Sequence, residues 1–137
     1  MDAVSDKTYF EAIPAEDCWQ LLHAQGVGRI AWANSEGITI LPVNHTVVED
    51  GIIIRTTPTG LLGELAHDVT VAFQVDDVDA ETQIAWSVLV RGRARELTEA
   101  ERADRSMTIP EPWAGGERNL LLRISVEQIS GRVLSGE

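Results

Sequence analysis

Several features are scarce in this sequence, and each scarcity argues against a class of protein. A single cysteine, Cys18, excludes an internal disulfide and is typical of a reducing compartment. No apolar run approaches the roughly 18 consecutive residues that a membrane-spanning helix needs. The first residues, MDAVSDKTYFEA, lack the positive start and apolar core of a secretory signal. We therefore expect a cytoplasmic protein with no membrane partner.

Basic residues are also few. The chain has 11 Lys and Arg against 22 Asp and Glu, which gives a formal net charge of −11. Most of this surface would repel a phosphate backbone, so we expect no nucleic-acid partner. Arg91, Arg93 and Arg95 occupy alternate positions of one strand-like run. They could serve an anionic ligand or line a solvated face, and we favour the solvated face.

No catalytic or metal-binding motif occurs. The three histidines, His23, His45 and His67, lie in different predicted elements and not at metal-ligand spacing, so we expect no metal site. Only His45 follows a segment that could belong to a site. There is no glycine-rich dinucleotide fingerprint and no Walker loop. We therefore nominate no side chain as a catalytic acid or base.

The pattern of apolar residues predicts one mainly β domain. At 137 residues the chain is long enough for one proper core. We expect residues 1–12 to form a loose arm and residues 76–79 an acidic turn. Consecutive strands with few helices favour a small antiparallel barrel with helices at its ends. The predicted helices cover residues 14–25, 58–67 and 98–107, and the predicted strands cover residues 27–34, 38–43, 52–54, 69–75, 82–97 and 119–126, with a partial strand after residue 128.

The stretch of residues 38–65 organises the rest of the prediction. A strand ends where Pro42-Val43-Asn44 interrupts it, Glu49-Asp50-Gly51 forms a turn, and a β-branched run follows. Thr57 is then a candidate N-cap and Pro58 a candidate first helical residue.

The start of this predicted helix has a chemical use. A helix N-terminus presents unpaired N–H groups that suit a phosphate. Arg55 precedes it and can supply a bidentate cation, with hydroxyl groups at Thr56, Thr57 and Thr59. The alternative is a capped helix beside an arginine in a surface ion pair, and the local sequence leaves both interpretations open.

Four tryptophans stand out in a chain with only 5% aromatic residues. Trp19 and Trp32 fit a core or a lid, and Trp86 lies within a strand beside Ser87. Trp113 lies in the Pro/Gly-rich loop of residues 110–116, where an aromatic side chain commonly packs against a ligand or a partner chain. It could also plug one end of the barrel, and we favour the ligand or partner.

The order of the segments GRIAW, ILPVN, DGIIIRT, VAFQVD, WSVLVRGRARELT, PEPWAGG and LLRISVEQISGR resembles a known family. Over about residues 14–134 the chain is similar to the pyridoxamine 5'-phosphate oxidase-like proteins, the FMN-binding split-barrel family, in its short actinobacterial form. The resemblance implies a mainly β fold, a six-stranded antiparallel split β-barrel with short flanking helices. It also implies a homodimer with FMN bound in clefts between the subunits.

The resemblance assigns cofactor-binding roles to three segments and one loop. The residues along the flavin ring would be Leu41, Pro42, Val43 and Asn44. Those at the phosphate would be Arg55, Thr56 and Thr57. Trp86 and Ser87 would face the ring, and Trp113 would lie near the partner's flavin.

Two departures from the family pattern bear on function. Relatives usually carry a phosphate-binding lysine after the arginine strand, and here Leu61 or a neighbour holds that place. Losing such a contact costs on the order of 1.5–3 kcal/mol. The chain also ends without the longer basic C-terminus of true pyridoxamine phosphate oxidases, so that activity is not supported.

The resemblance implies an FMN-dependent oxidoreductase that acts on an unidentified small molecule. A deazaflavin could take the place of FMN, since members of the broader family use one. The alternative is a non-catalytic ligand-binding dimer with a weakened cofactor site. The substitution at Leu61 favours that alternative, whereas Arg55, Thr56 and Thr57 favour the enzyme.

Overall fold

The computed structural model describes residues 8–111 and 119–136. Strands dominate it, and the helices are short. The elements are β1 (Thr8–Ala12), α1 (Ala15–Ala24), β2 (Val27–Asn34), β3 (Gly37–Val48), β4 (Gly51–Thr56), the 3-10 helix η1 (Leu61–His67), β5 (Val69–Asp79), β6 (Ile84–Glu96), α2 (Glu99–Ala103) and β7 (Leu120–Gly136).

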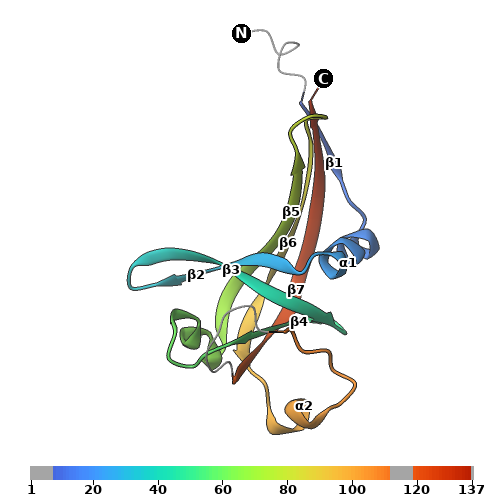
Figure 1. Cartoon of the computed structure of the whole chain (residues 1–137). Helices are drawn as coiled ribbons and strands as arrows, with labels where there is room; N and C mark the ends of the chain where they lie inside the picture. Colours follow the sequence, from blue (N-terminus) through green and yellow to red (C-terminus); the bar gives the residue numbers. More distant parts are fainter. Residues whose placement is uncertain (1–7, 112–118, 137) are drawn as a thin grey trace.

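Six strands close into an antiparallel ring in the order β2, β3, β4, β7, β6 and β5 (Figure 1). The ring closes where residues 29–31 of β2 pair with residues 72–74 of β5. The prediction of a mainly β, six-stranded antiparallel split barrel with short flanking helices is confirmed.

β5, β6 and β7 continue past the ring as an elongated sheet, which β1 joins (Figure 1). β1 runs antiparallel to the end of β7, with Thr8 opposite Gly136 and Ala12 opposite Arg132. The expectation of a loose arm is therefore wrong for residues 8–12. One edge of the last residues of the 17-residue β7 would otherwise have unpaired backbone N–H and C=O groups, and β1 forms hydrogen bonds with them.

β3 continues through Pro42, where the sequence predicted an interruption. It runs without a break from Gly37 to Val48. β4 pairs with β3 only from His45 onward, so among the described strands β2 alone pairs with β3 at Pro42. Proline is tolerated at such an edge position because no second ladder loses an N–H donor. Residues 41–44 are consequently part of the sheet.

The acidic residues 76–79 belong to β5, and the prediction that they form a turn is wrong. They pair with residues 84–87 of β6. The turn lies at residues 80–83, where Asp79 Oδ1 accepts hydrogen bonds from the backbone N–H of Glu81 (3.0 Å) and Thr82 (3.3 Å).

β7 is one long strand, where the sequence predicted a strand and a partial continuation. Its register with β6 shifts once, so that Arg91 lies opposite Gln128 and Gly92 opposite Val126. The extra residue forms a bulge. Gly92 is required there, because an added Cβ would lie 2.1 Å from the carbonyl oxygen of Ser125. The bulge separates the part of β7 that pairs with β4 from the part that pairs with β1.

The main core fills the ring, and α1 covers one side of it. α1 packs with the face that carries Cys18, Leu21 and Leu22, which are spaced three and four residues apart. Burial raises the pKa of the Cys18 thiol, which behaves as a small buried side chain. The largest fully buried side chains are Phe73, Leu22, Ile30, Ile52, Ile53, Ile54, Leu65, Leu122, Ile124, Val75, Val88 and Val90.

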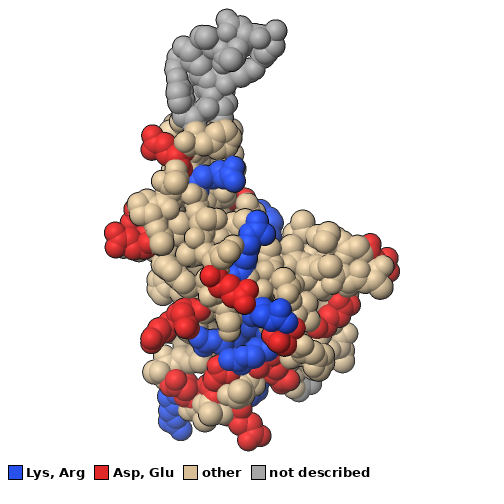
Figure 2. Space-filling view, turned by 180° about the vertical axis from the view of Figure 1, so that it is seen from behind, with Lys and Arg blue, Asp and Glu red and all other residues tan. Residues whose placement is uncertain are grey.

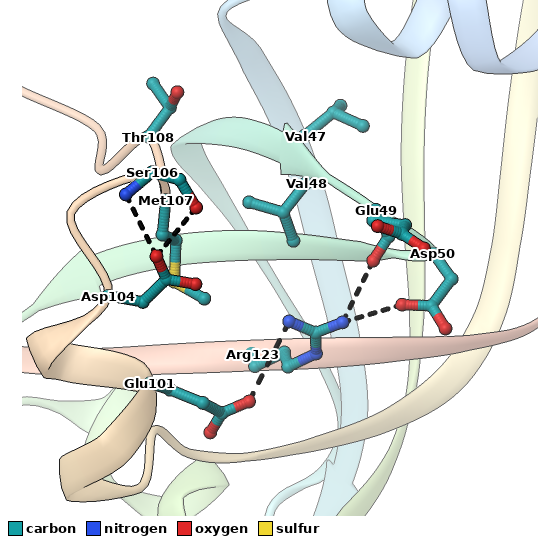
Figure 3. Close-up of a pocket in the computed structure, with 10 residues that line it drawn as sticks. All are labelled: Val47, Val48, Glu49, Asp50, Glu101, Asp104, Ser106, Met107, Thr108 and Arg123. Atoms are coloured by element: carbon teal, nitrogen blue, oxygen red, sulfur yellow. Dashed lines mark hydrogen bonds and ion pairs between the residues drawn. The ribbon is translucent and has the colours of Figure 1, made fainter.

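α2 begins with a capping box of Thr98 and Glu101, and it ends at Ala103, before the predicted end at residue 107. Its Glu101 also reaches the sheet, accepting two hydrogen bonds from the Arg95 guanidinium at 2.7 and 2.9 Å. Arg123, directly opposite Arg95 on β7, places its guanidinium 3.8 Å from the same carboxylate (Figure 3). Glu101 thus offsets the repulsion of two facing cations. Its pKa is lowered to about 2, first by the hydrogen bonds from Arg95.

We predict that Glu101→Gln lowers the free energy of unfolding by about 1–2 kcal/mol at pH 7. The folded-state pKa lies below the ordinary 4.5, so the stabilisation is complete above that pH and lost as the pH falls toward about 2. Urea denaturation at several pH values should show the difference between variant and parent shrinking below about pH 4.5. Glu99→Gln, an exposed neighbour in α2, is the matched control and should change stability by less than about 0.5 kcal/mol.

Candidate functional site

The residues predicted along the flavin ring divide between two faces of β3. Val43 is buried and Leu41 packs against the same core. Pro42 and Asn44 therefore lie on the outer face, since neighbouring residues of a strand alternate. Only the outer pair can present side chains to a ligand outside the barrel.

The residues predicted at the phosphate divide in the same way. Thr56 is buried, with 5% of its surface exposed, whereas Arg55 is half-buried on the outer face of β4. The ladder between β3 and β4 ends at the pair His45–Ile54. Asn44 and Arg55 are the next residues on the two strands, so the fold brings them together where the strands part.

The predicted helix start at Thr57 and Pro58 is wrong. Residues 58–60 form a turn, and the seven-residue 3-10 helix η1 begins at Leu61 after an extended Gly60. Thr57 does not cap it, and its hydroxyl lies 3.2 Å from that of Thr59. The local pattern of an N-cap residue followed by proline does not predict that Gly60 adopts an extended conformation and delays the helix start to Leu61. Without a helix N-terminus at this place, Arg55 and the exposed hydroxyls are what could hold a phosphate.

Trp86 and Ser87 lie on opposite faces of β6. Trp86 shares a face with buried Val88 and lines a shallow hollow beside α1. Ser87 lies on the outer face, between Asp76 of β5 and Arg132 of β7. Ser87 therefore shares the outer face with Pro42, and Trp86 does not.

Arg29 is a residue of this outer face that the sequence analysis missed. It lies opposite Pro42 on one side and Gln74 on the other, and its Nη1 is 3.1 Å from the Asp76 carboxylate. The ion pair bridges the space between Pro42 and Ser87. The alternation of Val27, Arg29 and Ala31 along the predicted strand was the signal that could have found it.

Two further predicted residues are Leu61 and Trp113. Leu61 is 46% exposed at the start of η1. Trp113 lies outside the described residues, so its predicted role stays a prediction.

His45 lies inside the barrel. It is 5% exposed, its Nε2–H donates to the carbonyl oxygen of Leu22 at 2.9 Å, and its ring meets Phe73 edge-on. Among the described residues its buried Nδ1 has no hydrogen-bond partner. Burial lowers the pKa of His45, because an imidazolium would need a second acceptor. The same described residues contain no cluster of potential metal ligands.

We predict that the free energy of unfolding decreases as the pH falls below about 6.5. At that pH the unfolded chain begins to bind a proton at His45, whereas the lowered pKa keeps His45 neutral in the folded protein. Urea denaturation between pH 7.5 and 5.5 should show this slope in the parent and in His23→Gln, the exposed control. His45→Gln should lose the slope. A slope that persists unchanged in His45→Gln would assign it to another group.

A second hollow lies under residues 104–108 and has a volume of about 460 Å³ (Figure 3). Arg123 lines it and donates to the carbonyl oxygen of Glu49 at 2.9 Å and to Asp50 at 2.7 Å. The partners of this arginine come from the protein itself. Among the predicted cofactor contacts that the structure describes, none lines this hollow.

Residues 14–133 match the sequence profile of the pyridoxamine 5'-phosphate oxidase family. The chain belongs to this family. An uncharacterized protein from Mycobacterium tuberculosis is 29% identical over 121 residues, covering 85% of this chain and 80% of the relative. An FAD-binding protein from Mycobacterium smegmatis is 28% identical, with a TM-score of 0.69, covering 91% of this chain and 98% of the other.

The fold is also that of a solved FAD-binding protein from Mesorhizobium loti, with a TM-score of 0.73 at 22% identity. That comparison covers 93% of this chain and 98% of the other. Among the described residues, no helix has the length and apolar character that crossing a membrane requires.

Proposed function

We propose that this protein is a homodimeric flavin-binding oxidoreductase that acts on a small molecule. Membership of the family supports the proposal, as does the FAD-binding protein from Mycobacterium smegmatis, which matches over nearly its whole length. The observation that carries it is the juxtaposition of Asn44 and Arg55 at the point where β3 and β4 part. The fold itself would permit many functions.

The side chains at this place fit a phosphorylated flavin. Arg55 supplies a fixed cation, and Thr57 and Thr59 supply hydroxyl groups next to it. The edge of β3 at residues 41–44 supplies an exposed strand on which a planar ring can lie. When bound, the flavin supplies the hydride chemistry, while the protein binds, orients and shields it.

FMN is the cofactor that we propose, because Arg55 and its neighbours provide for one phosphate group. FAD and a deazaflavin are the alternative cofactors for the same site. They differ from FMN in what lies beyond the phosphate or in the ring itself, so one titration series with all three compares them directly.

The second copy would cover the outer face of the sheet. Ile38 and Ile40 of β3 are 74% and 60% exposed there, beside the small side chains of Ala31 and Ala72. Neighbouring exposed isoleucines beside small alanine side chains are unusual on the surface of a monomer, and they suit an interface between two copies. Pro42 continues the same row, so a copy packed on this face would border the proposed flavin.

We predict that Ile40→Glu makes the protein monomeric at micromolar concentration, because a carboxylate would lose its solvation in the paired surface. Size-exclusion chromatography with light scattering measures the mass. Ile84→Glu is the control, since Ile84 is also exposed but lies on the opposite face. A monomeric parent protein would contradict the dimer.

We predict that Arg55→Ala weakens FMN binding by about 1.5–3 kcal/mol, or roughly ten- to a hundred-fold. Riboflavin lacks the phosphate, and its affinity should hardly change. Titration by flavin fluorescence measures both, with circular dichroism to check folding. Arg105→Ala, an exposed arginine in a loop, is the matched control. Equal losses for FMN and riboflavin would remove the phosphate role from Arg55.

A non-catalytic ligand-binding dimer is the second candidate, and exposed Leu61 favours it. Relatives carry a phosphate-binding lysine near this place, and a leucine there offers no charge. Leu61→Lys would strengthen FMN binding if the site is only weakened. The visible spectrum of the purified protein, before and after addition of FMN, distinguishes the candidates. A parent protein that binds neither flavin nor deazaflavin would favour the second.

Nucleic acid is not a proposed partner. On the face that Figure 2 shows, basic residues are interspersed with acidic ones. With a net charge of −11, most of the protein would repel a phosphate backbone.

A further inference from the structure

Residues 104–111, which follow α2, cross the outer face of the barrel and reach Asn44 of the proposed site. We call residues 104–111 the strap. Its first turn is fixed by Asp104, whose Oδ1 accepts hydrogen bonds from the N–H (2.9 Å) and the hydroxyl (2.6 Å) of Ser106 (Figure 3). Glu101 anchors the preceding helix to Arg95. The strap therefore leaves α2 in a defined direction.

The underside of the strap is apolar. Ile53, Leu97 and Leu121 form a small buried cluster on the outer face of the barrel, separate from the main core. Met107 and Ile109 of the strap pack against this cluster. Burial of these side chains holds the strap on β4 and β7, next to the position of Arg55.

Two side chains of β3 hold the main chain of the strap. The Thr46 hydroxyl donates to the carbonyl oxygen of Thr108 at 2.6 Å. The Asn44 amide donates to the carbonyl oxygen of Glu111. Thr46 and Asn44 are alternate residues on the outer face, so the two bonds fasten the strap along the edge of β3.

We propose that Asn44 is a positioning residue, which holds the strap as one wall of the flavin site. This inference rests on the proposed function. Asn44 lies next to Arg55 where β3 and β4 part, so its bond to Glu111 brings the end of the strap to the proposed phosphate contact. In this role the amide N–H of Asn44 serves the protein main chain, and Arg55 serves the cofactor.

Asn44→Leu tests the inference, because it keeps the side-chain size and removes the donor. Thr46→Val is the matched control, since it removes the other strap bond farther from Arg55. In the protein without flavin, hydrogen exchange at the amides of residues 107–109 and 111 should accelerate about two- to tenfold in Asn44→Leu. Exchange within α2 should stay unchanged, because Glu101 and Arg95 hold that helix independently.

Flavin binding gives the second measurement. Asn44→Leu should weaken FMN about two- to tenfold and change the visible circular dichroism of the bound flavin, which reports the surroundings of the ring. Thr46→Val should loosen the strap near Thr108 and leave FMN affinity within about twofold of the parent.

The outcomes separate this inference from the proposed function. Weaker FMN binding with unchanged exchange would make Asn44 a direct ligand and overturn the positioning role. Faster exchange with unchanged FMN binding would show a strap that is not a wall of the site, which also overturns it. A parent protein that binds no flavin would overturn the proposed function, and the wall with it. The exchange measurement would still decide whether Asn44 anchors the strap.

Discussion

The pairing of β6 with β7 is the interaction on which the other elements depend. The two strands run together from Ile84 opposite Ser135 to Glu96 opposite Leu122. One half of this ladder closes the ring, and the other supports the extension that β1 joins. β4 pairs with β7, and β3 pairs with β4. The register between β6 and β7 therefore also fixes the positions of β4 and β3. The proposed site at Asn44 and Arg55 therefore depends on two strands that do not carry it.

A constraint on charge follows from this ladder. Arginines recur on the outer faces of β2, β6 and β7, and Arg95 directly faces Arg123. Nearby carboxylates neutralise these charges in the described ion pairs, in which Asp68 pairs with Arg93 and Glu101 pairs with Arg95. Asp50 and Asp76 pair with Arg123 and Arg29 in the same way. The interpretation of the arginine run in β6 as a solvated face agrees with these pairs.

Errors in the sequence analysis arose where a local signal competed with a neighbour distant in the chain. Pro42 indicates a strand end, yet β3 continues because β4 does not pair with it at that residue. Residues 8–12 carry no strong strand pattern, and β7 draws them into the sheet. Thr57 and Pro58 have the chemistry of a helix start, and the extended Gly60 delays it. Each of these outcomes depends on a contact or a dihedral angle that composition does not encode.

The sequence by itself determined the strand alternation, the capping box of α2, the apolar face of α1 and the family. These features arise from residues a few positions apart, whose dihedral preferences and faces are local properties. Only the tertiary structure decided that Asn44 and Arg55 both follow the last pair of the β3–β4 ladder, and that the Asn44 amide reaches the main chain of Glu111, 67 residues away. Such a contact requires the register of several strands to be set together, and no local pattern specifies that register.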